Sequence, residues 1–266
     1  MSCSDRLLLS AACCVLLLSS APSRAQTLHG FVEKSVTVKE GDTQRRVKYR
    51  LRSPSRMEKG KKYPLIFFLH GAGERGSENK AQMRHFPELW RRRDFATQFD
   101  VFVLAPQCRR EKKWVDVPWS TTTSSPLPKQ SSADMRAALA ALDATIKAYP
   151  VDTSRIYLTG LSMGGYGSWY LAARYPKRFA AVGPVCGGGP EANAKNLAGV
   201  PIWAWHGDAD RSVPVARTRN MIAAIRKAGG TPKYTELKGV AHDSWVQAYQ
   251  PGGLLRWMLR QRRAIR

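Results

Sequence analysis

The stretch IYLTGLSMGGYG, from Ile156 to Gly167, constrains the fold more than any other part of the chain. A run of β type leads directly into the pattern Gly-x-Ser-x-Gly, and a helical pattern with an aromatic face follows. A sharp turn from strand to helix needs glycine at Gly160 and Gly164, where side chains would collide. The stretch therefore predicts that Ser162 projects its hydroxyl from the start of a helix. An ordinary glycine-rich turn is the alternative.

Short runs of β type alternate with helical patterns along the rest of the chain, as in proteins built from repeated strand and helix units. Residues 31–39 and 45–52 flank a turn and predict an N-terminal hairpin. Further strands are expected at 63–69, 100–105, 155–159, 182–186, 202–206 and 234–237, and helices at 134–149 and 215–228. Nearly continuous apolar runs are typical of parallel strands covered on both faces. The pattern indicates an α/β protein with a mostly parallel sheet.

One catalytic domain is expected to occupy residues 26–266, because no linker or repeat divides them and 43% hydrophobic residues suffice for a sizeable core. Residues 1–25 differ: Arg6 precedes the apolar run 7–18, and small residues suit a cleavage site after position 25. They predict a signal peptide and a secreted or periplasmic protein, which we expect to be a monomer. A membrane anchor is the alternative. Because about twelve apolar residues cannot span a ~30 Å hydrocarbon core, no stable membrane insertion is expected.

The chain is strongly basic, with 43 Lys and Arg against 20 Asp and Glu and a formal net charge of +23. The basic residues gather in clusters at 45–52, 59–62, 91–93, 109–113 and 256–266. Such runs usually form a solvated face, and the functional alternative is attraction to an anionic polymer such as an acidic polysaccharide. The sequence contains no nucleic-acid recognition motif, so a nucleic-acid partner is not expected.

A serine needs a base to act as a nucleophile at neutral pH, and the base needs a carboxylate to orient it. His242 is the best candidate for the base, because it follows a predicted strand after a glycine-containing loop. Asp210 and Asp208 compete for the third position, directly after the strand 202–206. We favour Asp210, because Asp208 lies closer to the strand and would brace the turn. Since the carboxyl ends of parallel strands share one edge of a sheet, Ser162, Asp210 and His242 can meet there.

Such a serine would also need two N–H groups that bind the negative charge developing on a carbonyl oxygen, an oxyanion hole. Met163, which follows the serine, is expected to provide one of them. The other is expected from the glycine-rich turn after the strand 63–69, with Ala72 as the first choice and Gly71 as the second. This turn matches no phosphate-binding glycine motif, and the sequence contains no metal-ligand spacing. No metal and no cofactor are therefore expected.

Five segments together resemble one branch of a known family. They are HGAGERGSEN (70–79), APQCRREKKW (105–114), GLSMGGYGSW (160–169), HGDADRSVP (206–214) and AHDSW (241–245). The set looks like the secreted α/β-hydrolases that include feruloyl-esterase-like and polyhydroxybutyrate-depolymerase-like enzymes and predicted peptidases. The resemblance implies an α/β-hydrolase fold with an eight-stranded sheet, and Ser162, Asp210 and His242 as a triad that cleaves carboxylic esters through an acyl-enzyme intermediate. A peptidase of the same fold and a non-catalytic protein that binds an anionic polysaccharide are the alternatives.

The expected site is open, since only residues 187–200 separate two strands where relatives of this fold carry a large lid domain. A longer insertion, 107–132, contains Trp114 and Trp119. Flat aromatic rings suit a sugar or a phenolic ring, so both residues are predicted to bind a carbohydrate-linked or polymer-linked ester. In the alternative, they only hold the insertion against the core.

Two cysteines follow the predicted signal peptide, Cys108 and Cys186. The strand order that the resemblance implies places two strands between them, a separation of roughly 14 Å at ~4.8 Å per strand. Because a disulfide needs Cα atoms within ~7 Å, both are expected to be free thiols unless the loop after Cys108 folds back across the edge of the sheet.

Overall fold

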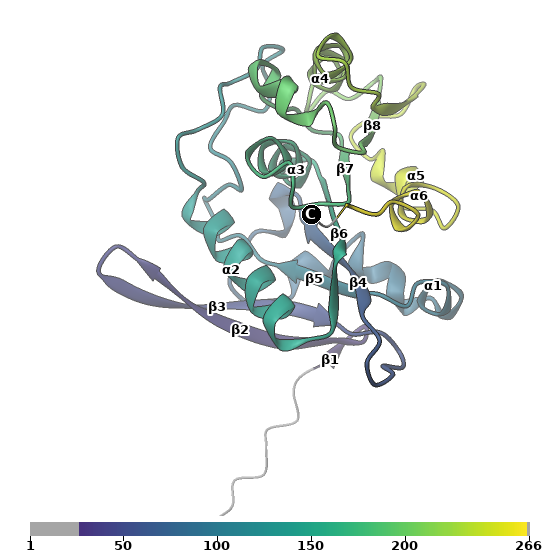
Figure 1. Cartoon of the computed structure of the whole chain (residues 1–266). Coiled ribbons are helices and arrows are strands. Elements are labelled where there is room, and N and C mark those ends of the chain that lie inside the picture. Colours follow the sequence, from purple (N-terminus) through teal and green to yellow (C-terminus); the bar gives the residue numbers. More distant parts are fainter. Residues whose placement is uncertain (1–26, 265–266) are drawn as a thin grey trace, which may run out of the picture.

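A mixed β-sheet forms the centre of the molecule (Figure 1). The structure is a computed structural model that describes residues 27–264, so the predicted signal peptide lies outside the described residues. Within that part of the chain, nine strands follow the order β1-β2-β3-β5-β4-β6-β7-β8-β9 across the sheet. They are β1 (Thr27–Leu28), β2 (Phe31–Glu40), β3 (Thr43–Arg52), β4 (Tyr63–Leu69), β5 (Phe102–Pro106), β6 (Val151–Leu161), β7 (Ala181–Val185), β8 (Trp203–Gly207) and β9 (Lys233–Leu237).

The strand directions divide the sheet into two parts. All pairings among β4 to β9 are parallel, whereas β1, β2, β3 and β5 pair antiparallel in that order. The prediction of a mostly parallel α/β-hydrolase sheet is confirmed. The expected number of eight strands is wrong, because β1 adds a ninth through the pairing of Leu28 with Phe31. A strand of two residues leaves no alternating pattern in a sequence.

Helices cover both faces of the sheet, which explains why the central strands are apolar throughout (Figure 1). One face carries α2 (Ala133–Ala148), α3 (Met163–Arg174), α4 (Ala216–Lys227) and η4 (Glu191–Leu197). The other carries η2 (Ala81–Met83), η3 (Pro87–Arg91), α1 (Arg93–Gln98), α5 (Trp245–Ala248) and α6 (Leu254–Leu259). None of the helices within residues 27–264 combines the length and the apolar character needed to cross a bilayer.

Local sequence explains where two of these helices begin and end. The Ser132 hydroxyl accepts a hydrogen bond from the Met135 N–H at 3.1 Å, a side-chain cap at the start of α2. Helix α4 ends just before Gly229, whose φ of +86° is left-handed, and the Gly230 N–H donates to the Ile225 carbonyl at 2.9 Å. The expected boundaries of both helices are confirmed to within one or two residues.

The carboxyl ends of the parallel strands lie together at one edge of the sheet. Leu69 pairs with Gly160, Leu161 with Val185, and Gly207 with Leu237. Between β7 and β8 the chain forms only the short helix η4, so the absence of a large lid domain is confirmed. The insertion 107–132 contains neither helix nor strand.

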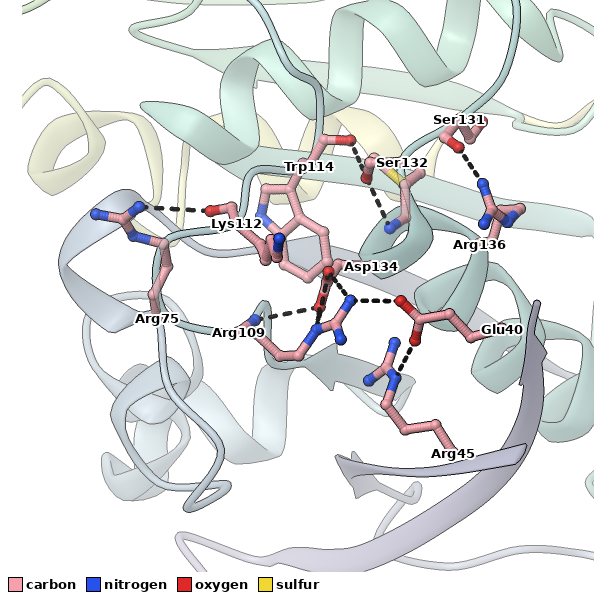
Figure 2. A network of polar contacts seen from close by, with 11 residues as sticks. Glu40, Arg45, Arg75, Arg109, Lys112, Trp114, Ser131, Ser132, Asp134 and Arg136 are labelled. Atoms are coloured by element: carbon pink, nitrogen blue, oxygen red, sulfur yellow. Dashed lines mark hydrogen bonds and ion pairs between the residues drawn. The ribbon is translucent and has the colours of Figure 1, made fainter. Parts of the chain in front are cut away.

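An ion-pair network ties this insertion to the β2–β3 hairpin and to the start of α2 (Figure 2). Nη2 of Arg109 lies 2.8 Å from Asp134 Oδ2 and 3.0 Å from Glu40 Oε1. Glu40 also accepts a bond from Nε of Arg45 at 2.6 Å. Two of the basic clusters thus supply arginines to ion pairs that join separate elements. Part of the excess positive charge therefore lies in ion pairs that hold elements of the fold together.

Cys108 and Cys186, the cysteines within residues 27–264, are free thiols, as expected. Cys108 follows β5 and Cys186 follows β7, and the strands β4 and β6 lie between them in the sheet. Both side chains are buried.

Candidate active site

Ser162 lies at the turn between β6 and α3, in a left-handed conformation with φ of 53° that is rare outside glycine. A Cβ atom at Gly160 would lie 2.6 Å from the Leu69 carbonyl oxygen, and one at Gly164 would lie 1.9 Å from it. Both positions therefore require glycine, as the sequence predicts. The Ser162 N–H donates to the Val185 carbonyl at 3.0 Å, which fastens the turn to β7.

A continuous chain of hydrogen bonds runs from Ser162 through His242 to Asp210. The Ser162 Oγ atom lies 2.8 Å from Nε2 of His242, and Nδ1 of the same ring lies 2.7 Å from Oδ2 of Asp210. Since an ionised carboxylate only accepts, Nδ1 carries a hydrogen and Nε2 of the neutral ring is left to accept the serine proton. The serine comes from the turn after β6, the aspartate from the turn after β8, and the histidine from the loop after β9.

Asp210 is held from both sides of its carboxylate. Oδ1 accepts the N–H groups of Ser212 and Val213 at 2.8 and 2.9 Å. Burial alone would raise the pKa of Asp210, but hydrogen bonds from His206, His242 and the Val213 N–H outweigh it and hold that pKa well below its usual range. The side chain therefore remains ionised at neutral pH. Asp208, the competing carboxylate, instead accepts the Gly239 N–H at 2.6 Å in an exposed turn.

The turn after β4 and the start of α3 lie against each other, as an oxyanion hole would need. The closeness of Gly164 to Leu69 places Met163, the first residue of α3, beside this turn. First-turn N–H groups of a helix have no partner within the helix, so the Met163 N–H can bind a substrate oxygen. In the turn, burial would raise the pKa of Glu74, but His85 above all, with His70 and the Gly71 N–H, outweighs burial and lowers it. Ala72 and Gly71 both belong to this turn, and Ala72 as the second donor stays a prediction.

His70 supports the same turn as an uncharged group. Its Nε2 accepts the Cys108 N–H at 2.9 Å, so its Nδ1–H donates to the Gly71 carbonyl at 2.6 Å. Burial lowers the pKa of His70 to about 4, so the ring is neutral at physiological pH.

The two tryptophans predicted to bind substrate lie in different surroundings. Trp114 is only 1% exposed, and its indole N–H donates to the His70 carbonyl at 3.0 Å. This placement fits the alternative in which Trp114 holds the insertion against the core. Trp119 is partly buried beside α3, where its carbonyl accepts the Tyr166 hydroxyl at 3.0 Å and the Lys113 ammonium lies 5.0 Å from its ring centre.

Trp245 lies beside His242 of the candidate triad and His85 lies beside Trp245, and neither was predicted from the sequence as a site residue. The Trp245 ring stands perpendicular to the His242 ring, with 5.5 Å between their centres, and lies 5.2 Å from the His85 ring. His85 in turn lies 3.5 Å from the Glu74 carboxylate. Trp245 follows His242 by three positions in the AHDSW segment, which is a usable signal. Nothing in the sequence connects His85 to this site.

Among the described residues, one group of side chains has metal-ligand types close together. Ligand atoms of Cys186, Asp210 and His242 lie within 4.8 Å of one another. The histidine and the aspartate are already bonded to each other through the atoms that a metal would need. Burial also raises the pKa of the Cys186 thiol far above its usual value, which disfavours the thiolate form. We assign the group to the hydrogen-bonded chain.

The fold is that of an α/β-hydrolase, and comparison with known families agrees. The model of the phospholipase/carboxylesterase family matches residues 56–251, so the chain belongs to that family. The resemblance to α/β-hydrolase esterases is confirmed by this match.

Proteins similar to this chain include solved structures as well as relatives known by sequence. The crystal structure of a thermostable esterase superposes with a TM-score of 0.77 at 33% identity, covering 88% of this chain and 64% of that one. A secreted protein of Arthroderma benhamiae is 25% identical over 72% of this chain and 23% of its own length. A bifunctional acetylxylan esterase/xylanase of Neocallimastix patriciarum is 28% identical over 36% of this chain and 14% of its own length. The chain thus spans less than a quarter of either of these two relatives.

Proposed function

We propose that this protein hydrolyses carboxylic esters, with Ser162 as nucleophile, His242 as general base and Asp210 as the carboxylate that orients the histidine. The observation that carries the proposal is the unbroken hydrogen-bonded chain of 2.8 and 2.7 Å that joins these three residues. Membership of the phospholipase/carboxylesterase family supports the same chemistry.

The geometry suits an acyl-enzyme mechanism. Ser162 Oγ attacks the ester carbonyl while Nε2 of His242 takes its proton, and the ionised Asp210 stabilises the imidazolium that forms. The N–H groups of Met163 and Ala72 bind the negative charge on the carbonyl oxygen. His242 then gives its proton to the departing alcohol. In the second half, His242 takes a proton from water, which attacks the acyl group, and then gives that proton to Ser162 Oγ as the Oγ–acyl bond breaks and the carboxylic acid leaves.

Several observations favour an ester attached to a carbohydrate or another polymer. No large lid covers the strand ends, so a chain longer than the site can lie across it. Trp245 lies beside His242, and Trp119 lies beside α3. Both rings are partly buried and can stack against a sugar or phenolic ring. The name of one relative, a bifunctional acetylxylan esterase/xylanase, indicates that this relative acts on such a polymer.

A panel of acetyl, feruloyl, longer acyl and peptide substrates, assayed with the protein and its Ser162→Ala variant, tests the proposal. We expect turnover of one or more esters, absent in the variant. Turnover of peptides alone would replace the esterase by a serine peptidase of the same fold. No turnover of any substrate by a folded protein would contradict both.

Replacing Trp245 by alanine is expected to raise KM for polymer-linked or aromatic esters about tenfold, because one aromatic stack is worth up to about 1.4 kcal/mol. KM for a small acetyl ester should change less than about threefold. Trp119→Ala should show the same selectivity if Trp119 also contacts substrate. Trp257→Ala is the matched control, since this ring packs on Trp203 at the opposite end of β8. Equal losses for both kinds of ester would count against a substrate role.

We also propose that residues 26–266 form the working domain after removal of a signal peptide, and that it acts outside the cytoplasm as a monomer. The N-terminal sequence pattern supports this. So does the secreted protein of Arthroderma benhamiae among the relatives, as far as its name goes.

The basic clusters named in the sequence are expected to hold the protein on an anionic polysaccharide column at low salt. Retention should disappear as ionic strength rises towards about 1 M, where the Debye length falls to about 3 Å. A column of the uncharged parent polysaccharide is the control. Retention that does not respond to salt would rule out the electrostatic explanation.

A further inference from the structure

His206, near the carboxyl end of β8, is fully buried and has no part in the mechanism above. Its Nε2 atom lies 3.2 Å from Oδ2 of Asp210, the oxygen that also binds Nδ1 of His242 at 2.7 Å. Nε2 lies 3.0 Å from the Val213 carbonyl as well. Because both of these neighbours are acceptors, Nε2 carries a hydrogen. Two imidazole N–H groups therefore share one carboxylate oxygen.

The other side of the His206 ring is also held. Nδ1 lies 2.7 Å from the hydroxyl of Thr218 in α4, and this hydroxyl lies 2.7 Å from the Gly187 carbonyl. The Thr218 hydroxyl donates to the Gly187 carbonyl, which fixes its oxygen beside Nδ1 of His206. With both ring nitrogens bonded, the Nε2–H keeps a fixed direction towards Asp210.

We propose that His206 is a positioning residue, which holds Oδ2 of Asp210 towards His242 and moderates the negative charge that His242 meets there. The proposal rests on the proposed function of the triad. The backbone N–H groups at Oδ1 fix one end of the carboxylate, and His206 fixes the other, so the group cannot rotate about its Cβ–Cγ bond. A donor on Oδ2 also draws charge from the oxygen that faces His242.

Other titratable groups surround the hydrogen-bonded side chains of His206, Asp210 and His242. Cys186 follows β7, Tyr166 belongs to α3, Glu236 to β9, and Asp243 is the exposed neighbour of His242. Burial raises the pKa of Tyr166 to about 12 and that of Cys186 further above its usual range. Hydrogen bonding to Arg219 lowers the pKa of Glu236 to about 2. These three groups, Tyr166, Cys186 and Glu236, therefore each keep one charge state between about pH 4 and 9.

Two amide variants separate the two nitrogens of His206. The amide nitrogen of glutamine falls near the position of Nε2, and that of asparagine falls near Nδ1. His206→Asn is expected to lower kcat/KM about 10-fold to 100-fold, because a hydrogen bond to a charged group is lost. The acid limb of its pH profile should move up by about half a unit, because Oδ2 then faces His242 alone. His206→Gln should restore kcat/KM to within about threefold and return the acid limb to its original place.

Thr218→Val supplies a milder test that leaves the imidazole in place. It should shift the pH profile in the same direction as His206→Asn, by a smaller amount. Urea unfolding of all variants measures their stability separately. A purely structural role predicts equal losses for the asparagine and glutamine variants, in proportion to stability and with unshifted acid limbs, and that result would overturn the proposal.

The Nδ1–H proton of His242, observed by NMR, gives a readout that does not need activity. Its resonance should move downfield in His206→Asn and stay near the original position in His206→Gln, because its bond to an unshared Oδ2 is stronger. An unchanged resonance in both variants would overturn the proposal even if no ester is hydrolysed. Failure of the unmodified protein to hydrolyse esters, with the expected resonance shift, would instead contradict only the proposed function.

Discussion

Replacing Ser162 by alanine is expected to lower kcat/KM for ester hydrolysis by about 10⁴-fold or more. The change removes the only atom that the His242 ring is placed to activate, at 2.8 Å from its Nε2, and no acyl-enzyme can form without it. Residual catalysis of about 10³-fold over water can remain, since the oxyanion hole and the binding surface are untouched. Initial rates with the best substrate of the panel measure the effect.

Ser55→Ala is the matched control for this variant. Its hydroxyl lies 3.1 Å from Asp100, which precedes β5, in an exposed turn away from the carboxyl ends of the parallel strands. Its loss should therefore leave kcat/KM unchanged. Both variants should unfold at nearly the same urea concentration as the original protein. A Ser162→Ala protein that is folded and still hydrolyses esters within tenfold of the original rate would exclude Ser162 as the nucleophile.

Replacing Asp210 by asparagine is expected to cost about 10⁴-fold in kcat/KM. The amide can donate to Nδ1 of His242, which moves the ring hydrogen to Nε2 and leaves no acceptor for the Ser162 proton. The same change at Asp208 should alter kcat/KM less than about threefold, because this exposed carboxylate bonds only the Gly239 N–H. The pair of variants thus compares two identical chemical changes two positions apart.

The reverse order of effects would assign the third role to Asp208 and contradict the geometry. The pH profiles of the two variants give a second comparison of the two residues. The Asp208→Asn profile should coincide with that of the original protein.

The parts of the site that local sequence determines could be predicted. Gly160 and Gly164 are required because a Cβ atom at either position would lie 2.6 Å or less from the Leu69 carbonyl oxygen, and the Gly-x-Ser-x-Gly pattern reports that requirement directly. The parallel strands place the turns after them at one edge, which is why Ser162 and His242 could be selected from residues 80 positions apart.

Other parts depend on directions in space that a sequence does not record. Asp208 and Asp210 follow the same strand, and contacts with Ser212, Val213 and His206 turn the second carboxylate towards His242. Trp114 has the residue type of a binding group, but its burial follows from how the insertion packs against His70. Neither His85 nor the contact between His206 and Asp210 leaves a local pattern.

Covalent labelling with a fluorophosphonate, followed by mass spectrometry of the peptides, tests the central claim most directly. The reagent reacts only with a serine whose hydroxyl is activated by a base and whose phosphoryl oxygen is held by an oxyanion hole. We expect one adduct, on Ser162 of the folded protein, and none after unfolding or in the His242→Gln variant. A folded protein that takes up no label, or takes it up at another serine, would contradict the assignment of Ser162, His242 and Asp210 as a catalytic triad.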